Sequence, residues 1–267
     1  MTRLITEWIS DIETEIQIYD DKLKSQLRMN LCQLTAKACG ITEEKFLEKM
    51  NHHAVAVIPI TAELGVISGF SESVSAILKV MGAHVFVTKG ANVDGIYEGL
   101  TKGADILFMA DDDRYIGFNI KTGAVADNNI ATAMGYVTAL EQLAGDLRNK
   151  KVLVIGCGIV GRKAVSVLKE KDVDVYIYDK NKEKVKSLNC GYVSVLSEDT
   201  AIKTFKFILD ATNEGGWIYK DMLADNVIIA TPGIPMSLDK KAYELHKDKV
   251  VHDYLQIGTA VMLGLTL

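Results

Sequence analysis

The chain has 267 residues, of which 48% are hydrophobic and 24% charged, and its formal net charge is −5. An acidic chain lacks the basic field of a nucleic-acid surface, and no apolar run approaches the roughly 20 residues of a membrane span. The N-terminal segment has early acids and no long apolar core, so it does not read as a signal peptide, and we expect a cytoplasmic globular protein.

The first part of the chain is predicted to be α/β. Apolar residues recur with helical spacing through 1–49, for example at Leu4, Trp8, Ile12 and Ile16. Later apolar runs predict strands, and helical patterns predict helices: strands at 55–60, 85–88 and 106–110, helices at 67–81 and 130–143. Strands that alternate with helices favour a parallel sheet covered on both faces.

Three consecutive acids follow the strand at 106–110. They are Asp111, Asp112 and Asp113, and Arg114 comes next. Charge gathered at the end of an apolar strand is costly without a cation. A ligand ammonium, a metal or Arg114 could each relieve it, and a surface turn with an ion pair is the non-functional alternative.

Two further polar sets flank these acids. Thr61 and Ala62 follow the first predicted strand, and Phe70 and Ser71 open the next helix. A helix N-terminus can hold a carboxylate through its N–H groups, although simple capping explains the same residues. Asn119 precedes the helix at 130–143 and is a further candidate substrate contact.

The segment 151–179 carries the most specific pattern. An apolar strand at 152–155 is followed by Gly156, Gly158 and Gly161 in GxGxxG spacing, then by a helix and a second strand ending at Asp179. The glycines permit a tight turn, close approach of a pyrophosphate and close helix packing, and the acid suits a ribose 2′-hydroxyl. This predicts NAD binding with NAD favoured over NADP, although the adjacent Lys180 weakens that preference. A non-binding α/β crossover is the alternative.

The remaining strands extend the dinucleotide fold. They are predicted at 205–210, 227–230 and 250–252. Ala211 and Thr212 follow the first, and Thr231 and Pro232 follow the second. Ligands bind at the carboxyl ends of such strands, so these loops are expected beside the nicotinamide half of the cofactor. Ordinary strand-to-loop punctuation would look the same.

The cysteines predict no disulfides and no metal site. Cys32, Cys39, Cys157 and Cys190 show neither CxxC spacing nor clustering with histidine, which fits reduced cytoplasmic thiols. Cys157 lies inside the glycine turn, and we interpret it as a small filler.

Several segments together resemble one family. IPITAELGVISGFSESV, GADILFMADDDRYIGFN, VLVIGCGIVG, ATPGIP and IGTAVMLGL are similar to the PylD family, NAD-dependent enzymes that complete pyrrolysine biosynthesis. The resemblance implies a homodimer whose small-molecule substrate is an isopeptide of lysine and 3-methylornithine. Its terminal primary amine is oxidised, and ring closure then expels ammonia. An N-terminal helix in this family folds over the site.

The resemblance also assigns residues. Asp111 is the acid that meets the substrate amine. The expected substrate wall is Leu4, Ile5, Thr61, Ala62, Phe70, Ser71, Met109 and Ala110, with Asn119 added as above. The expected cofactor residues are Gly156, Gly158, Ile159, Val160, Gly161, Tyr178, Asp179, Ala211, Thr212, Thr231 and Pro232. Ala62 is apolar where a small hydroxyl would be natural.

We therefore expect an α/β fold with a substrate domain at 1–148, a Rossmann NAD domain at 149–267 and a cleft between them. The last helix could pack back on the first domain. Two other functions fit the pattern less well. A related amino-acid or hydroxy-acid dehydrogenase would reduce NAD with simpler substrates, and a non-catalytic NAD sensor would bind NAD without turnover.

Overall fold

The computed structural model describes residues 4–63, 65, 67–186, 194–195 and 199–267. Within these residues the chain forms two compact units: Met1–Thr132 with Tyr254–Leu267 is unit 1, and Ala133–Asp253 is unit 2. The sequence placed the boundary at 148/149. The division at 132/133 falls within helix α7 (Asn128–Ala144), whose Tyr136 belongs to unit 2 and donates its hydroxyl to the Asp253 carbonyl 3.1 Å away.

Unit 1 is built on a mixed sheet in the order β2-β1-β3-β4-β5. Its strands are β1 (Ala54–Ile58), β2 (His84–Val87), β3 (Ile106–Ala110), β4 (Tyr115–Asn119) and β5 (Val125–Asp127). β1 runs parallel to β2 and β3, whereas β4 and β5 are antiparallel additions. The expectation of a wholly parallel sheet was wrong for this edge, because the short turn after β3 sends the chain straight back as β4.

Helices cover this sheet, and their bounds are α1 (Thr6–Ile9), α2 (Ile12–Leu27), α3 (Leu31–Ala38), α4 (Glu43–Asn51), α5 (Phe70–Val80), α6 (Asn92–Thr101) and α11 (Gln256–Thr266). α6 approaches β1 closely because it turns glycines inward: a Cβ built on Gly99 would lie 3.0 Å from the Cβ of Ala56. The opposite face of α6 carries exposed Val93 and Tyr97.

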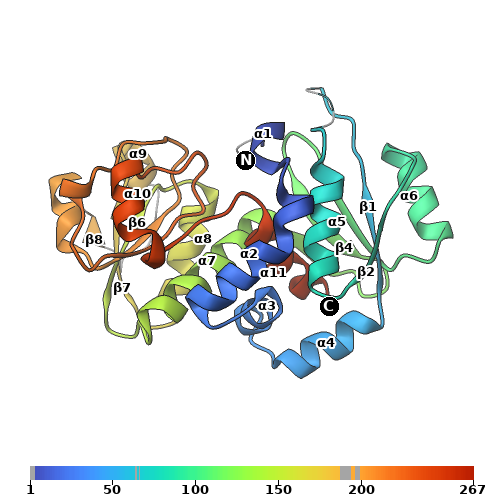
Figure 1. Ribbon diagram of the computed structural model, residues 1–267, viewed down its shortest axis with the longest axis horizontal. Helices are drawn as coiled ribbons and strands as arrows, with labels where there is room; N and C mark the ends of the chain where they lie inside the picture. Colours follow the sequence, from blue (N-terminus) through green and yellow to red (C-terminus); the bar gives the residue numbers. More distant parts are fainter. Residues whose placement is uncertain (1–3, 64, 66, 187–193, 196–198) are drawn as a thin grey trace. The chain divides into compact units, whose positions relative to one another are not determined.

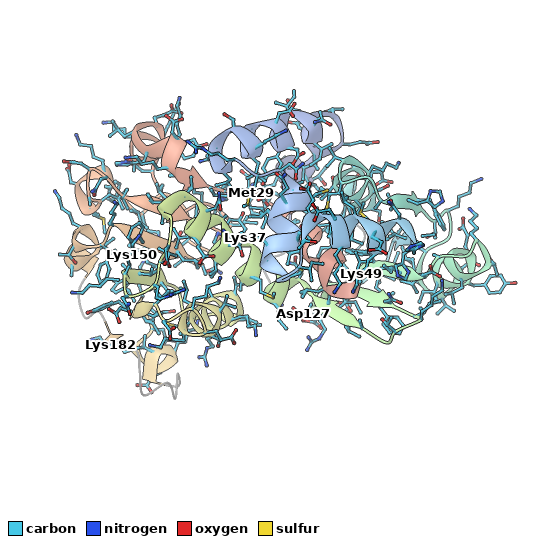
Figure 2. All side chains as sticks on the ribbon, turned by 90° about the horizontal axis from the view of Figure 1, so that it is seen from below. Met29, Lys37, Lys49, Asp127, Lys150 and Lys182 are labelled. Atoms are coloured by element: carbon cyan, nitrogen blue, oxygen red, sulfur yellow. The ribbon has the colours of Figure 1, made fainter. Side chains whose placement is uncertain are left out.

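α11 belongs to unit 1 although it follows the whole of unit 2 in the sequence. Figure 1 shows it beside α3 and α5, and its residues from Gln256 to Leu263 are buried. A helix that is apolar on all sides is stable only when it is buried in this way. Polar contacts fix it further: Lys49 Nζ, labelled in Figure 2, donates to the backbone oxygen of Leu267 at 2.7 Å.

Unit 2 contains a parallel sheet in the order β11-β10-β9-β6-β7-β8. The strands are β6 (Lys151–Ile155), β7 (Asp174–Tyr178), β8 (Ser194–Val195), β9 (Phe207–Asp210), β10 (Ile228–Ala230) and β11 (Val250–Val251). Besides the larger part of α7, the α-helices are α8 (Ile159–Lys169), α9 (Lys182–Lys186) and α10 (Lys240–His246), with 3₁₀ turns η1 (Asp199–Thr204), η2 (Lys220–Met222) and η3 (Lys247–Lys249).

This strand order is that of a Rossmann domain. The chain starts at β6, adds β7 and β8 on one side, and then returns to add β9, β10 and β11 on the other. The order reverses between β6 and β9, and ligands of such sheets bind outside the carboxyl ends at that point. The predicted fold class, α/β with a C-terminal Rossmann domain, is confirmed.

Candidate active site

The carboxyl edge of the unit 1 sheet gathers most of the predicted substrate residues. β1 and β3 are parallel and Ile58 is in register with Met109, so both strands end at this edge. Thr61 and Ala62 therefore follow β1 at the same edge where Asp111 follows β3. Half-buried Met109 and Ala110 form the last residues of β3.

Asp111 is held by the turn that it begins. Its Oδ1 accepts hydrogen bonds from the backbone N–H of Asp113 at 2.8 Å and of Arg114 at 2.6 Å. Its own N–H donates to the Arg114 carbonyl at 2.9 Å. This is the Asx-turn geometry that aspartate favours. Within the described part of the chain Oδ2 accepts no hydrogen bond, which leaves one carboxylate oxygen of this exposed residue for a ligand cation.

Arg114 forms an ion pair with an acid on another strand. Its guanidinium donates to Oδ2 of Asp127 at 3.1 Å, on the neighbouring strand β5; Asp127 is labelled in Figure 2. This ion pair ties the turn after β3 to β5, and it directs the Arg114 guanidinium toward Asp127 and not toward Asp111.

The N-terminal segment and α5 lie at this edge as well. Ser73 Oγ, in the first turn of α5, donates to the Ile9 carbonyl at 3.1 Å, which holds α1 against α5. Leu4 and Ile5 immediately precede α1. The Phe70 ring meets the Tyr115 ring edge to face at 5.2 Å between centroids, and Ser71 is buried.

Thr61 has a partner that the sequence did not reveal. The Thr61 N–H donates to Asn92 Oδ1 at 2.8 Å, and Asn92 Nδ2 donates to Thr61 Oγ1. Asn92 begins α6, 31 residues later in the chain. This pair fixes the loop after β1, while the side chain of Ala62 is apolar and its backbone carbonyl accepts from the Gly65 N–H at 2.9 Å.

Asn119 lies apart from the other predicted substrate residues. It is in register with Ile106, at the opposite end of β3 from Asp111, and its side chain is fully buried. Its Nδ2 donates to the Thr266 carbonyl at 2.8 Å, and its Oδ1 accepts from the backbone of Lys121 at 3.0 Å and Thr122 at 3.2 Å. The structure gives Asn119 a role in attaching α11 to β4, in place of the predicted substrate contact.

In unit 2 the glycine turn lies at the end of β6. Gly156 has φ +92°, and a Cβ there would lie 2.9 Å from the Ala211 carbonyl. A Cβ on Gly161 would lie 1.9 Å from Gly156 O, so only glycine lets α8 pack this closely. Gly158 is different, because its Cβ would meet open space. Two glycines thus serve packing, and Gly158 leaves room for a phosphate beside the start of α8, where Ile159 and Val160 follow.

Asp179 is fixed beside the same turn. Its Oδ2 accepts from the Cys157 N–H at 2.7 Å and its Oδ1 accepts from the Asn181 N–H at 2.7 Å. The half-buried Tyr178 ring lies 6.4 Å from that of Trp217. The acid thus has a fixed position after β7, where a ribose would lie.

The sequence did not single out Asp210, the last residue of β9. Its side chain is fully buried, and its Oδ1 accepts from Thr212 Oγ1 at 2.8 Å while its Oδ2 accepts from Thr231 Oγ1 at 3.2 Å and from Ser237 Oγ. Burial raises the pKa of Asp210, against the effect of these hydrogen bonds. The predicted threonines therefore direct their hydroxyls inward, so the loops after Ala211 and before Pro232 would contact a cofactor through their backbone. An acid ending an apolar strand was the available signal.

The cysteines in the described residues are free thiols. Burial raises the pKa of the Cys157 thiol to about 12, so it stays protonated at neutral pH, which supports its role as a filler. Burial likewise raises the pKa of Cys32 to about 12 and that of Cys39 to about 11. Cys190 lies outside the described residues.

Among the described residues no group of three or more His, Cys, Asp or Glu side chains is arranged to hold a metal ion. The described helices include none with the length and apolarity needed to span a membrane.

Comparison with known proteins agrees with this arrangement. Residues 8–126 match the model of the N-terminal domain of pyrrolysine biosynthesis protein PylD, and residues 123–264 match that of the alanine dehydrogenase/PNT C-terminal domain. Quinate dehydrogenase from Corynebacterium glutamicum, solved in complex with NAD, is similar in structure with a TM-score of 0.54 at 13% identity, covering 80% of this chain and 93% of that one. At that identity the likeness shows the fold alone. The match to the alanine dehydrogenase/PNT C-terminal domain, which covers more than half of the chain, places it among the dehydrogenase-type oxidoreductases.

Sequence relatives give the family. The chain is 33% identical over 225 residues to pyrrolysine synthase of Methanosarcina barkeri (strain Fusaro / DSM 804), covering 84% of this chain and 85% of that protein. It is 33% identical over 210 residues to pyrrolysine synthase of Methanosarcina acetivorans, covering 78% and 80%. The chain belongs to the PylD family of pyrrolysine synthases, and its biochemical role is in pyrrolysine biosynthesis.

Proposed function

We propose that the protein oxidises the terminal primary amine of the lysine–3-methylornithine isopeptide with NAD, and that ring closure with loss of ammonia then gives pyrrolysine. The observation that carries this proposal is the edge of the unit 1 sheet, where Asp111 keeps one carboxylate oxygen for a cation. Family membership supports the pathway, and the glycine turn with Asp179 supports a nicotinamide dinucleotide with an unphosphorylated ribose.

NAD, when bound, supplies the hydride acceptor. The open space beside Gly158 and the N–H groups at the start of α8 would hold its pyrophosphate, and Asp179 would accept from a ribose hydroxyl. The reaction requires that the carbon bearing the amine reach the nicotinamide ring.

Asp111 would bind the substrate as its ammonium. Only the neutral amine can release hydride from its carbon, and since an alkyl ammonium has a pKa near 10.4, neutrality at pH 7.4 costs roughly 4 kcal/mol. Asp111 favours the charged form, whereas exclusion of water from the site favours the neutral one. The N-terminal segment packed on α5 would contribute to that exclusion. A water chain would carry the released proton.

Ring closure follows from the substrate itself. Loss of a proton and a hydride converts the amine to an imine, whose carbon is attacked by the α-amine of the methylornithine part. The five-membered ring forms as the C–N bond to the original nitrogen breaks and ammonia leaves. Proximity within one molecule favours this step.

The test uses purified protein with the isopeptide and NAD. We expect NADH formation together with a cyclic product that has lost ammonia, measured by absorbance and mass spectrometry. Asp111→Asn should lower kcat/KM about 100-fold, because a hydrogen bond between charged groups is worth roughly 2–3 kcal/mol. Asparagine can still accept the two N–H groups of the turn, so the loop is retained.

Asp113→Asn, in the same turn, is the matched control and should leave kcat/KM within about threefold, as for an exposed charge. Unchanged turnover in Asp111→Asn would remove Asp111 from the mechanism. NADH formed from simple amino acids or hydroxy acids instead of the isopeptide would favour the related dehydrogenase, and binding of NAD without any turnover would favour the sensor. The homodimer and the cytoplasmic location stay predictions.

A further inference from the structure

An exposed ion pair lies at the carboxyl end of the unit 2 sheet. Lys180 Nζ donates to Glu214 Oε2 at 2.7 Å, and the two side chains are 57% and 58% exposed. Lys180 follows β7 and Glu214 follows β9, and these strands flank β6 in the sheet. The pair therefore spans the carboxyl end of β6, where the glycine turn begins.

Trp217 gives this pair a defined location. Lys180 Nζ lies 5.2 Å from the centroid of the Trp217 ring, and that ring is tilted against Tyr178 at 6.4 Å. A cation over an indole face is attracted by the ring. Both Glu214 and Trp217 thus act on the same ammonium group, although each exposed contact is weak alone.

Asp179, next to Lys180 in the chain, is held more firmly than this ion pair. Both carboxylate oxygens of Asp179 accept backbone N–H groups, from Cys157 and from Asn181. A 2′-phosphate on the adenosine ribose would meet this fixed negative charge. Lys180, Lys182 and Lys184 all follow β7, and Lys180 is the cation directly adjacent to the acid.

We propose that Glu214 is a specificity-determining residue that holds Lys180 and thereby keeps it from a 2′-phosphate, so that NAD is selected over NADP. This inference rests on the proposed function, since it assumes a nicotinamide dinucleotide in unit 2. Lys180 beside the acid, which alone would weaken the preference for NAD, ceases to do so once Glu214 neutralises it. A second nearby cation, Arg162, donates its Nε to the Cys157 carbonyl at 2.9 Å and one terminal nitrogen to the Lys184 carbonyl at 3.3 Å, so it is also directed at the protein.

The test is a double-mutant cycle with the full chain: wild type, Glu214→Gln, Lys180→Met and the double variant. The Kd values of NAD and of NADP are measured separately by calorimetry. Low ionic strength is used because salt weakens interactions between exposed charges, and the Debye length is only about 10 Å at 0.1 M. Glu244→Gln is the matched control, because Glu244 forms an ion pair of similar exposure, 55%, with Lys247 at 3.1 Å in the same unit.

We expect Glu214→Gln to lower the Kd of NADP about fivefold, the size of an exposed charge interaction, and to change the Kd of NAD less than about twofold. In the Lys180→Met background the same substitution should change the Kd of NADP less than about twofold. Glu244→Gln should change neither.

Three results would overturn the inference. An unchanged Kd of NADP in Glu214→Gln would remove Glu214 from cofactor selection. An equal gain with and without Lys180 would mean that Glu214 acts by direct repulsion and not by holding the lysine. Wild-type protein that binds neither dinucleotide would reject the proposed cofactor and this inference together, whereas wild type that binds NAD with no gain in Glu214→Gln would reject the inference alone.

Discussion

Replacing Asp210 tests what holds the loops after β9 and β10. In Asp210→Ala, the Thr212 N–H and the hydroxyls of Thr212, Thr231 and Ser237 lose their acceptor. A net hydrogen bond is worth about 1 kcal/mol, so four of them amount to a loss of roughly 3–4 kcal/mol in the free energy of unfolding. Asp210→Asn should cost less than about 1 kcal/mol, because its amide accepts with one atom and donates to hydroxyl oxygens with the other.

The assay is urea unfolding of both variants and wild type as a function of pH. Burial raises the pKa of Asp210 above its ordinary 3.8. At pH values between the unfolded and the folded pKa, the folded protein therefore holds a proton that the unfolded chain has released. The contribution of this group to stability is therefore fully present below about pH 4 and declines as pH rises through the folded pKa. The Asn variant has no such titration, so wild type should lose stability relative to it over that range. A difference that stays constant with pH, or an Ala variant as stable as wild type, would refute the reasoning.

Two other substitutions follow from single contacts. Gly161→Ala would place a methyl group 1.9 Å from Gly156 O, so we expect a loss of about 1–3 kcal/mol in stability and weaker NAD binding, measured by unfolding and calorimetry; normal binding would contradict the packing of this turn. Asn119→Ala removes the buried contact to the Thr266 carbonyl and should cost roughly 2–3 kcal/mol in stability while kcat/KM of the folded enzyme stays unchanged. A folded variant with strongly reduced kcat/KM would instead return Asn119 to the substrate site.

The sequence was most informative where local pattern and function coincide. The strand at 106–110 has the same bounds in the structure, and the glycine turn, its helix and the acid at 179 follow one another within 30 residues. Such a unit requires each glycine for backbone reasons that are visible in the chain itself. The three acids after this strand were visible as a cluster of charge, and the assignment of Asp111 to the substrate amine stays a prediction.

The rest depended on contacts between distant parts of the chain. The partner of Asn119 lies 147 residues later, so its amide looked available for a ligand. β4 alternates buried and half-buried residues around Gly117, and a glycine there weakens the usual strand signal. Asp210 was predicted only as the last residue of a strand, because the sequence does not show that Ser237, 27 residues later, donates a hydrogen bond to it.

The place of α11 in the chain has a consequence for folding during synthesis. α11 follows 133–253 in the sequence, and ribosomes add about 5–20 residues per second, so synthesis of unit 2 takes roughly 6–24 s before α11 is made. During that interval unit 2 can complete its own sheet, while the apolar faces of α3 and α5 that receive α11 stay open to water. We therefore expect nascent chains of this protein to fold unit 2 before unit 1 can close its core.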